Sequence, residues 1–216
     1  MLNPPDMRVV YATQMRTHVH ELIAMGYNLM DNTPSFANSE EPAITGELIR
    51  SMKELLESEN APKWAIYYSI SDDPPMNVNG KYGKDRPRVD LEFERTGIRG
   101  SRPRFRFEAK RLGTTSGHTV AAYLGENGLG CFISGKYPIN NAEGGMLGYI
   151  QNGSEESWSD RIERALNNKD KNKYDAIDPP YQHQQVCSLK YTYISHHYSK
   201  ALSRVIIIHH VLLRFY

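Results

Sequence analysis

Cysteine is scarce in this chain of 216 residues, which contains only Cys131 and Cys187. The two lie far apart in the sequence and show no C-x-x-C spacing, so they form neither a disulfide framework nor a thiolate zinc motif. So few cysteines are typical of a reducing compartment, and we expect a cytoplasmic protein.

Long apolar runs are also missing. The closest approach to one is RVIIIHHVLLRFY at 204–216, which is shorter than the roughly 20 residues that a membrane-spanning helix needs. Residues 1–12 lack a basic segment followed by an apolar run, so we expect no signal peptide. The sequence therefore predicts no membrane partner.

Charge of one sign is not in excess, since the formal net charge is +1. A nearly neutral chain is not steered as a whole toward a polyanion, although a local basic patch remains compatible with that total. Charged residues make up 24% and hydrophobic residues 39% of the chain, as in an ordinary globular protein. The length suits a single domain over 1–216.

Apolar periodicity predicts an α/β fold, with a central mixed sheet flanked by helices. Ser39 is the expected N-cap of the second helix. Helices are predicted at 8–29, 41–60, 116–127 and 154–169. Strands are predicted at 64–71, 88–94, 104–112, 129–138, 144–153, 185–195 and 204–216, and the last two are additional C-terminal strands.

The strands at 88–94 and 104–112 carry an unusual charge pattern. Asp90 and Glu92 occupy alternate positions of the first, and Glu108 and Lys110 share one face of the second. Neighbouring strands bring facing side chains to about 5 Å between Cβ atoms. Asp90 and Glu108 would then repel each other unless a cation lay between them.

A hard divalent cation fits this pattern. Mg²⁺ prefers oxygen ligands, keeps several waters, and needs only one or two carboxylates from the protein. Lys110 would direct its ammonium group to the same place, where it would orient a water or neutralise charge on a phosphate. A metal ion combined with a lysine indicates hydrolysis of a phosphodiester.

An aspartate near one strand, followed by E-x-K in the next, resembles the PD-(D/E)xK superfamily of restriction-endonuclease-like nucleases. The predicted order of elements over about 41–151 is also similar to the core of that superfamily. The resemblance implies that Asp90 and Glu108 bind the metal together with the backbone carbonyl of Ala109. It implies that Lys110 is the catalytic lysine.

The resemblance further implies a Mg²⁺-dependent (or Mn²⁺-dependent) endonuclease that acts on DNA rather than RNA, in restriction or antiviral defence. A homodimer or a subunit of a larger defence complex is the expected assembly. Some members add a glutamate from the first core helix, for which Glu47 and Glu41 are the candidates. The sequence departs from the superfamily pattern in that no proline directly precedes Asp90, because Pro87 lies earlier.

A basic connection joins the two strands and is a second candidate region. Arginine side chains suit phosphate groups because they donate in a planar fork. We expect phosphate contacts from four arginines of this connection and from one that follows Lys110: Arg95, Arg99, Arg102, Arg104 and Arg111. The alternative is an ordinary charged loop.

Other interpretations of the same residues remain open. The simplest is a solvated hairpin with a Glu–Lys pair and no chemistry. A nuclease-like fold without catalysis, serving as a binding or assembly subunit, is the second. A glycosidase that uses Asp90 and Glu108 is disfavoured by Lys110 on the same face. The adjacent histidines at 196–197 and 209–210 have no zinc spacing, and each pair would point to opposite faces of a strand.

Overall fold

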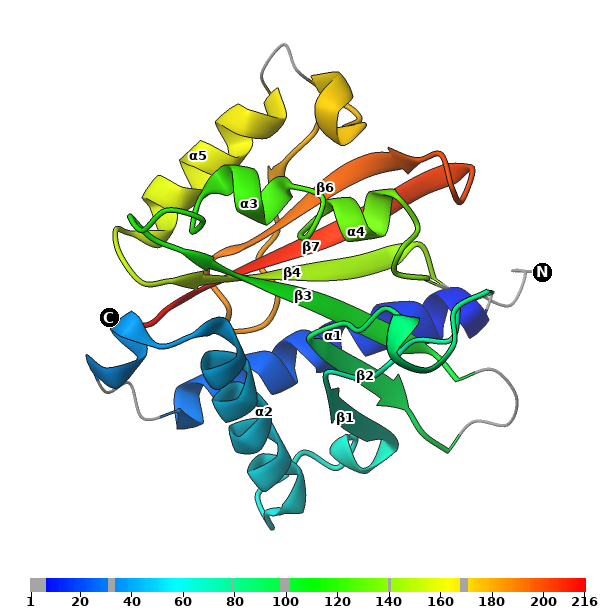
Figure 1. Ribbon diagram of the computed structural model, residues 1–216. Coiled ribbons are helices and arrows are strands. Elements are labelled where there is room, and N and C mark those ends of the chain that lie inside the picture. The colour runs from blue at the N-terminus through cyan, green and yellow to red at the C-terminus, as the bar shows by residue number, and fades with distance from the viewer. Residues whose placement is uncertain (1–6, 31–33, 79, 98–101, 140, 168–170) are drawn as a thin grey trace, which may run out of the picture.

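The computed structural model describes residues 7–30, 34–78, 80–97, 102–139, 141–167 and 171–216 (Figure 1). Seven strands form one mixed sheet in the order β1-β2-β3-β4-β7-β6-β5. The strands are β1 (Tyr68–Asp72), β2 (Leu91–Arg95), β3 (Arg104–Leu112), β4 (Glu143–Ile150), β5 (Gln182–His183), β6 (Thr192–Ser199) and β7 (Arg204–Arg214). The α/β class and the helix-flanked mixed sheet are confirmed.

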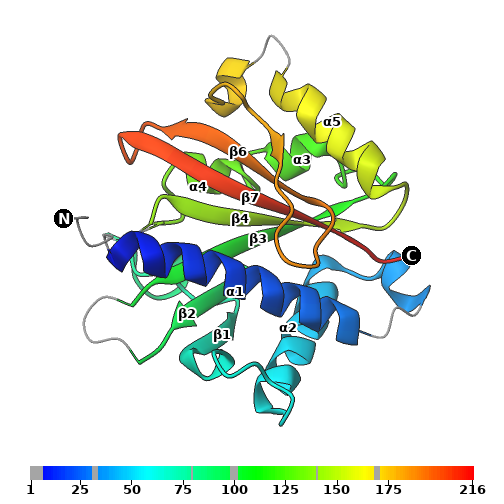
Figure 2. The same ribbon diagram turned by 180° about the vertical axis from the view of Figure 1, so that it is seen from behind.

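Helices cover both faces of this sheet. They are α1 (Met7–Leu29), α2 (Glu41–Glu57), α3 (Val120–Leu124), α4 (Gly130–Ile133) and α5 (Glu155–Asn167), with 3₁₀ turns at Pro34–Asn38, Ala65–Tyr67, Gly83–Asp85 and Lys171–Tyr174. Figure 2 shows α1 crossing the sheet on the face opposite α3 and α5. None of the described helices is both long and apolar enough to cross a membrane.

Each face of the sheet has its own hydrophobic core. The first core joins α1 and α2 to β1, β2 and β3 through buried residues such as Leu22, Leu48, Phe93 and Phe107. The second lies under α3, α4 and α5 and includes Tyr123, Phe132 and Ile162. Period-2 alternation explains the division, because Phe105, Phe107 and Ala109 point to the first face and leave Glu108 and Lys110 for the second.

The parallel strands β3, β4 and β7 form the centre of the sheet, and β2 continues it on the β3 side in antiparallel orientation. In the β2–β3 pair Leu91 lies opposite Phe107 and Phe93 opposite Phe105. Because β2 begins only at Leu91, no strand among the described residues lies beside the second half of β3 on that edge. This short free edge of β3 positions the candidate site.

Two predicted strands are wrong in whole or in part. Residues 129–138 contain helix α4 instead, because the backbone amides of Ile133 and Ser134 bond to carbonyls four residues earlier in the chain, at Leu129 and Gly130. The strand predicted at 185–195 begins only at Thr192, since Cys187 has a φ of 55° and lies in a tight turn.

Smaller corrections concern element boundaries. The predicted strand at 64–71 starts with a 3₁₀ turn at Ala65–Tyr67, because the backbone of Ala65 bonds to Pro62. Ser39 does not cap α2: Glu40 occupies the N-cap position and makes no side-chain capping bond. The helix predicted at 116–127 spans only Val120–Leu124, with Thr119 as its N-cap and Gly125 as its C-cap.

Candidate active site

Two carboxylates bind the free edge of β3. Ala109 N donates a hydrogen bond to Asp90 Oδ2 at 2.7 Å, and Arg111 N donates one to Glu41 Oε2 at 3.2 Å. In a continuous sheet a neighbouring strand would satisfy these amides. Because β2 does not extend along this half of β3, Asp90, just before β2, and Glu41, at the start of α2, bind the amides of the same edge.

Lys110 lies at the centre of this arrangement. Its Nζ donates to Glu108 Oε1 at 2.8 Å, to Glu41 Oε1 at 3.2 Å and to Ala109 O at 2.6 Å. We call Glu41, Asp90, Glu108, Ala109 and Lys110 the acid–lysine site. It holds three carboxylates and one ammonium group, so acids are in excess.

Burial makes that excess of acids costly. The Glu108 side chain is 7% exposed and the Lys110 side chain 18%. Burial and then the negative charge of Asp90 raise the pKa of Glu108 to about 7. Burial also raises the pKa of Asp90 and of Glu41 above their ordinary values. Burial opposes the charge on Lys110, but Glu108 and Glu41 outweigh it and raise the lysine pKa.

Tyr137 completes the site from the loop after α4. Its hydroxyl donates to Glu108 Oε2 at 2.8 Å, and its side chain is buried. This leaves Glu108 Oε1 turned toward Lys110. Tyr137 was not predicted because residues 129–138 were assigned to a strand. A tyrosine after a Gly-Lys turn is not a motif that would have revealed it.

The two candidate helix glutamates have different surroundings. Glu41 contacts Lys110, whereas Glu47 forms an ion pair with Arg50 on the exposed side of α2. Glu92, which shares the alternation of Asp90, pairs with Arg106 instead. Gln151, at the end of β4, donates its amide to Phe36 O and Ser39 O.

Four of the five predicted phosphate-contacting arginines are described, and each has a partner within the protein. Arg102 and Arg104 donate to Glu94 at 2.6 Å and 2.8 Å. Arg95 lies 4.7 Å above the ring of Tyr11. Arg111 pairs with Glu40. Arg99 lies outside the described residues. Phosphate contact by the connection stays a prediction.

The paired histidines do point to opposite faces of their strands. His209 Nε2 bonds to Glu143 on one face of β7, and His210 Nε2 bonds to Ser195 on the other. Across the described residues, no group of three or more His, Cys, Asp and Glu side chains is arranged to hold a metal ion. A metal at the acid–lysine site would therefore rely on two carboxylates and a carbonyl oxygen.

No protein-family model, no curated protein and no solved structure matches this chain.

Proposed function

We propose that this protein is a metal-dependent nuclease that hydrolyses phosphodiester bonds at the acid–lysine site. One observation carries the proposal: three carboxylates, the Ala109 carbonyl and the Lys110 ammonium meet at the free edge of β3. Buried carboxyl groups whose pKa values are raised by burial and by each other are typical of functional sites, where a cation compensates them.

The donors fit a hard divalent cation. Asp90, Glu108 and the Ala109 carbonyl offer only oxygen atoms, which is what Mg²⁺ or Mn²⁺ binds. Two carboxylates with one carbonyl suffice, because Mg²⁺ takes its remaining ligands from water and substrate phosphate. When bound, such an ion supplies positive charge that polarises a phosphate and acidifies a water.

The residues of the chain supply positioning and protons. Lys110 Nζ, held by Glu41, orients the attacking water and neutralises charge that builds on the phosphate oxygens. Tyr137 fixes one oxygen of Glu108, so that the other stays directed into the site. In the metal-free protein the pKa of Glu108 is about 7, so binding of a divalent cation near neutral pH would release the proton of this carboxyl.

The order of elements supports a restriction-endonuclease-like core. α2, β1, β2, β3, α3 and β4 follow one another over about 41–151, and β3 and β4 are parallel. The proposal favours DNA over RNA as the substrate and restriction or antiviral defence as the biological setting. Both points rest on the family resemblance alone. Cutting both strands of DNA would need two copies of the site, for which a homodimer is the simplest arrangement.

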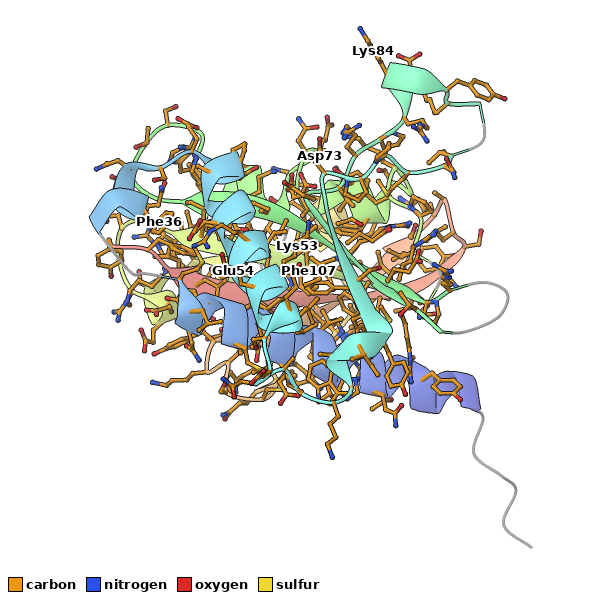
Figure 3. All side chains as sticks on the ribbon, turned by 90° about the horizontal axis from the view of Figure 1, so that it is seen from below. Phe36, Lys53, Glu54, Asp73, Lys84 and Phe107 are labelled. Atoms are coloured by element: carbon orange, nitrogen blue, oxygen red, sulfur yellow. The ribbon has the colours of Figure 1, made fainter. Side chains whose placement is uncertain are left out.

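Cleavage of two polymers tests the proposal. Supercoiled plasmid and a structured RNA are incubated with the protein in Mg²⁺ or in EDTA, beside Lys110→Ala and Glu108→Gln. Lys53→Ala is the matched control, because Lys53 is exposed on α2 (Figure 3). We expect Mg²⁺-dependent cutting that falls by at least about 100-fold in both site variants and is unchanged in the control.

The opposite outcome is equally clear. If the wild type cuts neither polymer in Mg²⁺ or Mn²⁺ but binds one of them, the protein is a catalytically silent binding or assembly subunit. If cutting persists in Lys110→Ala and Glu108→Gln, the activity belongs to another site or to a contaminant.

A further inference from the structure

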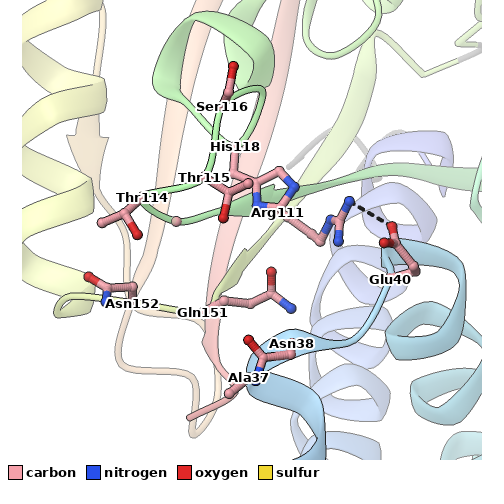
Figure 4. Close-up of a pocket in the computed structure, with 11 residues that line it drawn as sticks. Ala37, Asn38, Glu40, Arg111, Thr114, Thr115, Ser116, His118, Gln151 and Asn152 are labelled. Atoms are coloured by element: carbon pink, nitrogen blue, oxygen red, sulfur yellow. Dashed lines mark ion pairs between the residues drawn. The ribbon is translucent and has the colours of Figure 1, made fainter.

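A polar pocket of about 500 Å³ lies at the ends of β3 and β4 (Figure 4). Its walls are the loop 113–118 after β3, residues 151–152 after β4, and residues 37–40 before α2. We call it the β3–β4 pocket. Because the two strands are parallel, their carboxyl ends meet here, and this is the edge at which α/β sheets bind ligands.

The pocket is next to the acid–lysine site along the chain and in space. Arg111, which lines the pocket, follows Lys110 directly. Both residues are tied to the start of α2: Lys110 contacts the Glu41 carboxylate, and Arg111 donates its backbone N–H to the same group. A ligand in the pocket would therefore lie beside the reacting group of a substrate.

Arg111 supplies a fixed positive charge. Its guanidinium donates to Ser39 O at 3.3 Å and pairs with Glu40 Oε2 at 2.7 Å. The arginine side chain is only 19% exposed, whereas that of Glu40 is 74% exposed. The guanidinium is thus held by the protein, while the carboxylate that covers it is free to move into solvent and let another anion take its place.

The loop 113–118 offers the pocket neutral hydrogen-bond donors and an imidazole. Thr114, Thr115 and Ser116 are exposed between Gly113 and Gly117, and Figure 4 shows the His118 ring beside Arg111. Two backbone bonds, Gly113 N to His118 O and His118 N to Thr115 O, fix the loop. Hydroxyls, an imidazole and a guanidinium around one cavity form a donor set suited to an oxyanion.

We propose that the β3–β4 pocket binds a phosphate group, through Arg111, His118 and the hydroxyls of residues 114–116. This deepens the proposed function and rests on it in one respect, namely that the phosphate belongs to a nucleic-acid substrate. Two sources share this chemistry: the phosphate next to the one hydrolysed, or a phosphate at the end of a strand. Glu40 then acts as a competing anion that the phosphate displaces.

Binding of inorganic phosphate tests the pocket itself. Calorimetry in EDTA measures the affinity, and the NMR signal of the His118 ring at fixed pH reports whether phosphate enters this pocket. We expect Arg111→Gln to weaken binding about tenfold or more, because a charge-assisted fork is lost. We expect Glu40→Gln to strengthen it severalfold, because the competing carboxylate is removed. In Lys110→Ala, we expect phosphate to shift the His118 signal as it does in the wild type.

The Glu40 variant keeps the test informative if Arg111→Gln fails to fold. Glu40 is exposed and makes no capping bond to α2, so its loss should leave the fold intact. Equal phosphate affinity in the wild type, Glu40→Gln and Arg111→Gln would overturn the proposal. So would binding that leaves the His118 signal unmoved.

Oligonucleotides with a 5′-phosphate, a 3′-phosphate or neither distinguish the two sources, again in EDTA. A preference for one phosphorylated end that disappears in Arg111→Gln assigns a terminal phosphate. Equal affinities that all fall in Arg111→Gln assign an internal one. Equal affinities that the variant does not change contradict the proposal. Because nothing is cleaved here, failure of the nuclease assay and failure of the pocket are separate results.

Discussion

The β2–β3 pair carries a charged cluster at each end, and the two clusters differ in their balance of charge. At the hairpin end, two acids meet three arginines in what we call the hairpin cluster: Glu92, Glu94, Arg102, Arg104 and Arg106. At the other end, the acid–lysine site sets three acids against one lysine. The same two strands thus carry one cluster in which every acid has an arginine partner and one in which the acids outnumber the cation.

This difference in charge balance makes the acid–lysine site, and not the hairpin cluster, the candidate functional site. Each acid of the hairpin cluster has an arginine partner on the same strand pair or in the connection, so its charge is compensated within the protein. The acids of the acid–lysine site come from separate elements, and the single ammonium group contacts only Glu41 and Glu108. An unbalanced buried cluster costs stability, and strongly perturbed carboxyl groups of this kind mark candidate functional sites.

Removing the central lysine should have the largest effect. Lys110→Met leaves Glu108 and Glu41 without their shared ammonium, and we expect a loss of about 3 kcal/mol in the free energy of unfolding without metal. Arg104→Met in the hairpin cluster should cost at most about 1 kcal/mol, because Arg104 is largely exposed. Urea unfolding in EDTA measures both. Equal losses would show that the two clusters do not differ.

The pH dependence of stability should have opposite signs in the two clusters. The pKa of Glu108 rises on folding from 4.5 to about 7. The stability that Glu108 contributes is therefore complete below pH 4.5 and is lost as the pH rises through about 7. The free energy of unfolding of the metal-free protein should change by about 3 kcal/mol over this range. Hydrogen bonds from Arg102 lower the pKa of Glu94, so its contribution is lost as the pH falls below 4.5.

Unfolding titrations of two variants check these signs. Glu108→Gln should flatten the stability curve on the neutral side, and Glu94→Gln should flatten it on the acid side. If Glu108→Gln left the neutral side unchanged, the carboxyl would not carry a raised pKa.

Tyr137→Phe should have an intermediate effect. The variant removes the hydroxyl that donates to Glu108 Oε2, which we expect to cost about 1–2 kcal/mol and to move the pKa of Glu108 higher still. The titration of the Glu108 carboxyl carbon by NMR measures the pKa. Tyr82→Phe is the control, because Tyr82 is 80% exposed. An unmoved Glu108 pKa would mean that Tyr137 only fills space.

Arg102→Ala should have the smallest effect. The Arg102 side chain is 51% exposed, and exposed ion pairs contribute about 0.5 kcal/mol that salt screens further. Urea unfolding at low and high salt measures the difference. A loss of unfolding free energy as large as that of Lys110→Met would contradict the view that the exposed ion pairs of the hairpin cluster contribute little.

Much of the candidate site follows from local patterns. Period-2 alternation placed Glu108 and Lys110 on one face, and their 2.8 Å contact confirms that placement. The hairpin was found for the same reason, since Phe93, Phe105 and Phe107 alternate with charges. Tyr137 was missed because its segment has a strand-like composition but folds as a helix and a turn.

The sequence by itself determined the sheet-and-helix class, the paired strands and the face that carries the acids, because these depend on the spacing of residues near one another in the chain. Only the tertiary structure decided that Glu41 rather than Glu47 reaches Lys110, that Tyr137 holds Glu108, and that Arg111 and His118 share a pocket. These contacts join residues between 7 and 69 positions apart in the chain. They depend on where β2 and α2 begin in space, which no local periodicity encodes.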